Sequence, residues 1–203
     1  MSKDKSSNEY SGEYFKSNKE FHYNFEKAAE EYLVSSGSMY MDHVLGGGLG
    51  AGLHRFCGAN EGGKTNAALH VMLNMLNSVN NSKGLLVTAE GRLSKEIKER
   101  SGLKFVYTPE EWKTGTCLVF QCCVQDTVVD FLRGLLKNNK DKEKFCIVID
   151  SMDGLITKAD LEKTSSEARK VAAGALMTSD FLKRVSLGMS KFGHMCIMIS
   201  QIR

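Results

Sequence analysis

A glycine-rich stretch in the first third of the chain combines residue types that suit phosphate binding. It runs over residues 58–66 and reads Gly58, Ala59, Asn60, Glu61, Gly62, Gly63, Lys64, Thr65, Asn66. The spacing fits the G-x-x-x-x-G-K-[ST] pattern of a P-loop. In a P-loop the backbone N–H groups point at phosphate oxygens, and the start of the following helix adds partial positive charge. The stretch therefore predicts a site for the phosphates of a nucleotide.

The neighbouring residues place this stretch where a P-loop belongs. A β-prone run over 53–57 precedes it, and an apolar helical pattern over 66–79 follows. We expect Lys64 to reach the β- and γ-phosphates and the Thr65 hydroxyl to bind Mg²⁺. The alternative is a chance turn in a chain with 19 glycines among 203 residues. The strand before and the helix after the loop favour the nucleotide site.

An apolar run over 145–149 ends abruptly in the carboxylate of Asp150. A buried strand presents polar groups at its carboxyl end, and ligands bind at that end of an open parallel sheet. We therefore expect Asp150 to be a Walker B acid that holds Mg²⁺ together with Thr65. The alternative is that Asp150 caps a helix that follows the strand.

Two further apolar runs end in polar side chains. The run over 84–89 precedes Glu90, which is placed to accept a proton from a water that attacks the γ-phosphate. The alternative is a solvated carboxylate at a strand end. The run over 195–200 precedes Gln201, whose amide could sense the γ-phosphate by hydrogen bonding. The predicted catalytic residues are therefore Glu90 and Gln201 at these strand ends, together with Lys64 of the glycine-rich stretch.

The alternation of apolar runs and helical patterns predicts an α/β fold. Apolar runs lie at 53–57, 84–89, 116–123, 145–149 and 195–200, and helical patterns at 66–79, 93–101, 125–138 and about 166–192. Continuous apolar strands separated by helices indicate a mostly parallel sheet that is covered on both faces. We expect one core domain over 38–203, with an irregular excursion at 104–115. Residues 1–37 should form a flexible arm with a short amphipathic helix around Phe25 to Leu33.

Composition narrows the class of protein. A formal net charge of +3 permits nucleic-acid binding without arguing for it. The six cysteines lie mostly in apolar runs without a C-x-x-C pair, so we expect buried thiols in a reducing compartment. No apolar run reaches the ~18 residues of a membrane span, and no apolar segment follows the first five residues. A cytoplasmic protein without a membrane partner is the expectation.

The order of these motifs resembles the ATPase core of the RecA recombinase family, with its phage UvsX branch as a possible nearest group. The resemblance runs from about residue 38 to the end of the chain. It is carried by the glycines of 46–50, the P-loop, Ala89-Glu90, Ile149-Asp150-Ser151, Leu155-x-x-Lys158-Ala159-x-Leu161-Glu162 and Ser200-Gln201-Ile202-Arg203. The aspartate–serine and glutamine–isoleucine–arginine segments together are much more specific than the P-loop alone.

This resemblance implies a RecA-like core that uses ATP and Mg²⁺ and binds single-stranded DNA in recombination and repair. Glu90 takes the place of the catalytic carboxylate, and Gln201 that of the switch that couples the γ-phosphate to DNA. The family's first DNA-binding loop maps to about 162–174. The cations at that loop and at the chain end are Lys163, Arg169, Lys170 and Arg203. For the first three, the alternative is a solvated helix face.

Self-association is also implied, as a filament of the complete protein that is built through the ATP interface and the N-terminal arm. Phe25 and Ala28 fit the F-x-x-A tether by which relatives dock on a neighbouring subunit, although both residues could equally pack on their own domain. The sequence departs from the family in two ways. Residues 91–97 contain no aromatic side chain to stack on adenine. The chain also stops at Arg203, where a second DNA-binding loop would begin, so we expect a fragment of a longer protein or a reduced relative.

Two other kinds of function share these residues. Another ATPase of the same fold, such as a replicative helicase or a KaiC-like regulator, would keep the ATP chemistry. A non-catalytic recombination mediator would bind nucleotide and a recombinase without turnover. An intact Glu90 and Asp150 argue against the mediator, whereas the stop at Arg203 argues for it.

Overall fold

The computed structural model describes residues 6–17, 31–89, 91, 93–161, 179, 183, 185–186 and 188–202. Six strands form one sheet in which every pairing is parallel. They are β1 (Gly52–Gly58), β2 (Ser82–Thr88), β3 (Lys104–Val106), β4 (Thr116–Gln121), β5 (Lys144–Asp150) and β6 (Met195–Gln201). Their order across the sheet is β1-β6-β5-β2-β4-β3. The predicted α/β fold with a parallel sheet is confirmed.

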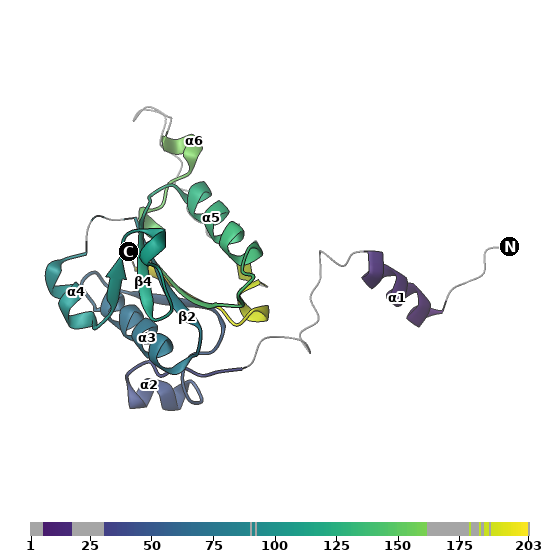
Figure 1. Cartoon of the computed structure of the whole chain (residues 1–203), viewed down its shortest axis with the longest axis horizontal. Coiled ribbons are helices and arrows are strands. Elements are labelled where there is room, and N and C mark those ends of the chain that lie inside the picture. Colours follow the sequence, from purple (N-terminus) through teal and green to yellow (C-terminus); the bar gives the residue numbers. More distant parts are fainter. Residues whose placement is uncertain are drawn as a thin grey trace.

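The helices of the described part are mostly short. They are α1 (Ser7–Ser17), α2 (Met39–Val44), α3 (Lys64–Ser78), α4 (Lys95–Ser101), α5 (Gln125–Lys137) and α6 (Lys158–Leu161), with 3₁₀ turns η2 (Pro109–Glu111) and η3 (Met152–Gly154). Figure 1 shows α3 and α5 packed against the twisted sheet, with α4 beside α3. None of the described helices combines the length and apolar character needed to cross a bilayer.

Alternation along the central strands divides the core between two faces of the sheet, because successive side chains of a strand point in opposite directions. On β5, Cys146 and Val148 belong to the cluster that includes the buried face of α3. Phe145, Ile147 and Ile149 belong to the cluster that includes the buried face of α5. A strand buried on both faces must be apolar at nearly every position, which explains the unbroken apolar run in the sequence.

Strand β6 lies between β1 and β5. It therefore pairs on one side with the strand that precedes the glycine-rich loop and on the other side with the strand that ends in Asp150. In the ladder, Gly58 of β1 is level with Gln201 of β6. Thr88 of β2 is likewise level with Asp150 of β5. The carboxyl ends of four strands therefore meet at one edge of the sheet, which is the edge where an open parallel sheet binds ligands.

Several parts of the sequence prediction need correction. A short strand, β3, and the turn η2 occupy part of the 104–115 segment, for which an irregular excursion was expected. Helices α1 and α2 form where no helix was predicted, because their apolar residues lack a long helical period. Tyr32 and Leu33 lie outside any helix. The rest of the amphipathic pattern, and most of the 166–192 pattern, lies outside the described residues.

The cysteines also differ from expectation. Cys117, Cys146 and Cys196 are buried, as predicted, but Cys122 is only half-buried. Cys57 and Cys123 are exposed, although each is the last residue of an apolar run. The reason is their place in the fold: Cys57 is near the end of the edge strand β1, and Cys123 lies beyond the end of β4.

The imidazole of His194, the residue directly before β6, is buried and stacks on the ring of Phe145, with centroids 5.1 Å apart. Its Nδ1 accepts a hydrogen bond of 3.1 Å from the backbone N–H of Phe145. Its Nε2 has no hydrogen-bond partner among the described residues. Burial lowers the pKa of His194 to about 4, because the charged form loses its hydration.

This burial predicts a stability that depends on pH. The unfolded chain takes up a proton at His194 near its ordinary pKa of about 6.5, whereas the folded chain resists it down to about pH 4. The free energy of unfolding should therefore fall by up to about 3 kcal/mol as the pH drops through this window. Urea unfolding at a series of pH values between 4 and 7.5 measures this change in the free energy of unfolding.

A non-titrating variant separates His194 from the other groups that titrate in this window. We expect His194→Asn to be less stable at pH 7.5, since it loses ring packing, and to show a smaller fall in stability on acidification. The exposed His43 on α2 provides the matched control, and His43→Asn should retain the parent's pH dependence. An unchanged pH dependence in His194→Asn would contradict this account.

Candidate functional site

The glycine-rich loop between β1 and α3 turns sharply at a glycine before the helix begins. Strand β1 ends at Gly58, and α3 begins at Lys64. Gly63 caps the helix with φ 77°, in the left-handed region that a glycine adopts without steric cost. The helix has 15 residues, so its N-terminus directs unpaired backbone N–H groups and a partial positive charge into the loop.

Lys64 lies against the backbone of its own loop. Its Nζ donates hydrogen bonds to the carbonyl oxygens of Gly58, at 3.1 Å, and of Ala59, at 2.6 Å. These contacts hold a cation at the point where β1 ends, beside the start of α3. A fixed positive charge next to a helix N-terminus forms a local environment that attracts anions.

Thr65 and Asp150 meet although 85 positions separate them in the sequence. The Thr65 hydroxyl donates a hydrogen bond of 2.7 Å to Oδ2 of Asp150. A hydroxyl and a carboxylate are hard oxygen donors, and Mg²⁺ characteristically takes only one or two protein ligands while it keeps water and phosphate oxygens. The donor set therefore fits Mg²⁺. Among the described residues there is no cluster of three or more histidine, cysteine or acidic side chains that would suit a metal held by protein alone.

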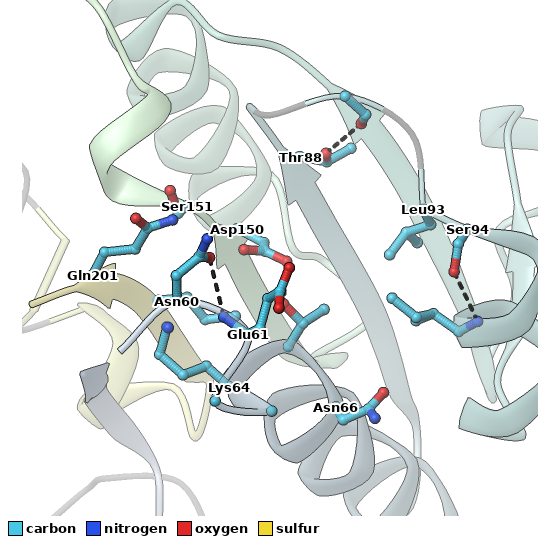
Figure 2. Close-up of a pocket in the computed structure, with 16 residues that line it drawn as sticks. Asn60, Glu61, Lys64, Asn66, Thr88, Leu93, Ser94, Asp150, Ser151 and Gln201 are labelled. Carbon is cyan, nitrogen blue, oxygen red and sulfur yellow. Dashed lines mark hydrogen bonds between the residues drawn. The ribbon is translucent and has the colours of Figure 1, made fainter. Parts of the chain in front are cut away.

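A cavity of about 460 Å³ opens at this edge of the sheet, which is within the size range of small-molecule sites. It is lined by Asn60, Glu61, Gly62, Gly63, Lys64, Thr65, Asn66, Thr88, Gly91, Leu93, Ser94, Ile97, Asp150, Ser151, Ile199 and Gln201. Figure 2 shows Lys64, Asp150 and Gln201 at one end and Leu93 with Ser94 at the other. One end of the cavity thus carries charged and polar groups, and the other end offers aliphatic side chains.

The structure brings together most of the predicted site residues that it describes. Residues 60–66, Asp150 and Gln201 line the cavity. Gly58 and Ala59 do not line it, and they contribute through the carbonyl groups that hold Lys64. The side chain of Gln201 extends toward Ser151 and Asp150 (Figure 2). The loop after β1, the start of α3 and the ends of β5 and β6 therefore form the charged end of the cavity.

Other predicted site residues lie outside the described part of the chain. These are Glu90 and the four predicted DNA contacts Lys163, Arg169, Lys170 and Arg203, together with Phe25 and Ala28 of the predicted tether. The two neighbours of Glu90 are described. The backbone N–H of Ala89 donates to the carbonyl of Asp150 at 2.9 Å, and Gly91 lines the cavity.

Sequence reasoning missed part of the lining. Leu93, Ser94 and Ile97 belong to the segment that begins α4, and the Ser94 hydroxyl caps that helix by accepting the N–H of Ile97 at 3.2 Å. The signal that identifies them is the aliphatic pair Leu93 and Ile97, at positions i and i+4 a few residues after β2 ends, whereas the prediction considered only an aromatic side chain in this segment. Thr88, the last residue of β2, and Ile199, inside β6, were missed because an uncharged residue within an apolar run gives no local sign of lining a site.

The parallel sheet, the P-loop at the end of β1 and the acid at the end of β5 together define a RecA-like P-loop core. The chain matches no model of a known protein family. It is similar to individual proteins named RecA. Over 177 residues it is 28% identical to the RecA of Chlorobaculum tepidum, an alignment that covers 84% of this chain and 46% of that protein.

Two further relatives give the same result. The RecA of Mycoplasma pneumoniae is 28% identical over 179 residues, covering 87% of this chain and 49% of the relative. The RecA of Nostoc punctiforme is 27% identical over 175 residues, and the alignment covers 84% of this chain and 44% of the relative. The resemblance to the RecA family that the motifs predicted is confirmed. The chain spans about half the length of the curated relatives it matches.

Proposed function

We propose that this chain is the ATPase core of a RecA-type recombinase, which binds and hydrolyses Mg²⁺-ATP in response to single-stranded DNA. The observation that carries the proposal is the 2.7 Å hydrogen bond between Thr65 of the P-loop and Asp150 at the end of β5. It brings the two expected Mg²⁺ ligands together beside Lys64 at one end of a cavity of nucleotide size. The similarity to RecA proteins supports the same function.

In this proposal the phosphates bind at the charged end of the cavity. The N–H groups of the loop and of the first turn of α3 donate to phosphate oxygens, while Lys64 leaves its loop carbonyls to reach the β- and γ-phosphates. Thr65 and Asp150 hold Mg²⁺, which would neutralise charge that develops on the phosphate oxygens. The sugar and base extend toward Leu93 and Ile97, whose side chains offer apolar contact.

Glu90 is proposed as the base. It follows the end of β2, whose last residue Thr88 is level with Asp150 in the sheet. A carboxylate there would orient a water molecule for in-line attack on the γ-phosphate and accept its proton. Gln201, at the end of β6, is proposed to hydrogen-bond the γ-phosphate and so report whether the triphosphate is intact.

The proposed partners are single-stranded DNA and further copies of the same protein. Lys163, Arg169, Lys170 and Arg203 are proposed to contact DNA phosphates, which would make binding sensitive to salt. Self-association is proposed through the nucleotide site and the N-terminal arm. Within the described residues β1 is an edge strand, so its outer side is open to an added strand.

The test is the rate of ATP hydrolysis by this chain with and without single-stranded DNA, measured alongside ATP binding. We expect Mg²⁺-dependent ATP binding and hydrolysis that single-stranded DNA accelerates. Strand separation of duplex DNA driven by ATP would instead indicate a helicase. Tight ATP binding without any product in a single-turnover assay would indicate a non-catalytic mediator, and absence of ATP binding would refute the proposal.

A further inference from the structure

The carboxylate of Asp153 fixes the backbone of Gln201. Asp153 lies in η3, which begins two residues after Asp150, and its Oδ2 accepts the backbone N–H of Gln201 at 2.7 Å. The ladder between β5 and β6 ends earlier, at Ile149 and Met198. Asp153 therefore reconnects the ends of these strands beyond the point where ordinary sheet pairing stops.

The other side of the same strand end is fixed to the phosphate loop. The backbone N–H of Ile202 donates to the carbonyl oxygen of Gly58 at 3.2 Å. That carbonyl also accepts a hydrogen bond from Nζ of Lys64. The segment that carries Gln201 is thus attached to the P-loop on one side and to η3 on the other.

Three groups at the charged end of the cavity, Thr65, Asp150 and Gln201, are thus held by hydrogen bonds. A hydrogen bond from an N–H group to an ionised carboxylate is about twice as strong as one between neutral groups. The direction of the Gln201 side chain depends on the backbone of Gln201, because side-chain direction in a strand follows the backbone. Restraining that backbone N–H therefore restrains where the Gln201 amide points.

We propose that Asp153 is a positioning residue that aims the Gln201 amide at the terminal phosphate of a bound nucleoside triphosphate. The inference rests on the proposed function, since it requires a nucleotide in the cavity. The affinity for a triphosphate, and not the affinity for a diphosphate, should depend on Asp153. A diphosphate contacts Lys64 and the loop, neither of which hydrogen-bonds Asp153, whereas a triphosphate also meets Gln201.

The experiment compares the affinities of this chain for Mg²⁺-ADP and for a non-hydrolysable Mg²⁺-ATP analogue, measured by titration calorimetry. We expect Asp153→Ala to reduce the preference for the triphosphate about tenfold, which corresponds to the loss of one hydrogen bond to a charged group. The affinity for ADP should stay within about twofold of the parent. Asp153→Asn retains a carbonyl oxygen that can accept the Gln201 N–H, so it should restore most of the preference.

Asp126 provides the matched control. Its exposed carboxylate also accepts a backbone N–H, that of Lys158 at 2.9 Å, and it does not line the cavity. Asp126→Ala should leave both affinities unchanged. A preference in Asp153→Ala equal to that of the parent, or an equal loss in Asp126→Ala, would overturn the inference while leaving the proposed function intact. A parent chain that binds neither nucleotide would refute the proposed function and this inference with it.

Discussion

Lys64→Ala is expected to lower the affinity for Mg²⁺-ATP by at least about a hundredfold, because each hydrogen bond to a charged group contributes about 1.5–3 kcal/mol and Lys64 is proposed to serve two phosphates. The site is otherwise preserved, since Thr65 remains bonded to Asp150 and α3 still presents its N-terminus. Titration of the parent and the variant with a fluorescent ATP analogue measures the change.

The variant must be shown to fold before the loss of binding is assigned to the lost cation. In the structure Lys64 bonds only to carbonyl groups of its own loop among the described contacts, so α3 and the sheet should form without it. Far-ultraviolet circular dichroism and the unfolding midpoint provide this check. Lys113→Ala, at an exposed position away from the cavity, serves as the matched lysine variant. A folded Lys64→Ala protein with the parent's ATP affinity would disprove the assignment of the P-loop.

Glu90→Gln is expected to bind ATP normally and to hydrolyse it about 10²–10⁴-fold more slowly, the usual effect of losing a general base. The amide keeps the shape of the side chain but cannot accept the proton of the attacking water. The expectation rests on the position of Glu90, directly after Ala89, whose N–H donates to the carbonyl of Asp150, and before Gly91, which lines the cavity. Single-turnover hydrolysis in the presence of single-stranded DNA measures the rate of chemistry separately from product release.

A neighbouring glutamate provides the comparison. Glu96 lies on α4 and pairs with Arg100 at 2.7 Å on the surface of the helix. Glu96→Gln should hydrolyse ATP at the parent rate, because an exposed ion pair within a helix contributes little to the site. Equal rates for the parent and Glu90→Gln would assign the proton transfer to another group. Slow hydrolysis combined with weak ATP binding would mean that Glu90 shapes the site and does not act as its base.

The sequence by itself was enough to predict the strands β1, β2, β4, β5 and β6 and the helices α3, α4 and α5. These elements are local: a fully buried parallel strand needs a continuous apolar run, and a helix beside the sheet needs an apolar face with helical period. The pattern of the glycine-rich loop is equally local, and it is the basis of the predicted phosphate site. Its glycines and its lysine must stand at fixed spacing for one short stretch of backbone to surround a phosphate.

Only the tertiary structure decided which strand ends meet. The bond between Thr65 and Asp150 spans 85 positions, and no local pattern specifies that β6 enters the sheet between β1 and β5. The hydrogen bond from the Gln201 backbone to Asp153 depends on that strand order, and so does the stacking of His194 on Phe145. Such contacts depend on the packing of segments that are distant in the chain. The sequence therefore determined the residues that could bind phosphate, whereas the fold decided which groups surround and orient them.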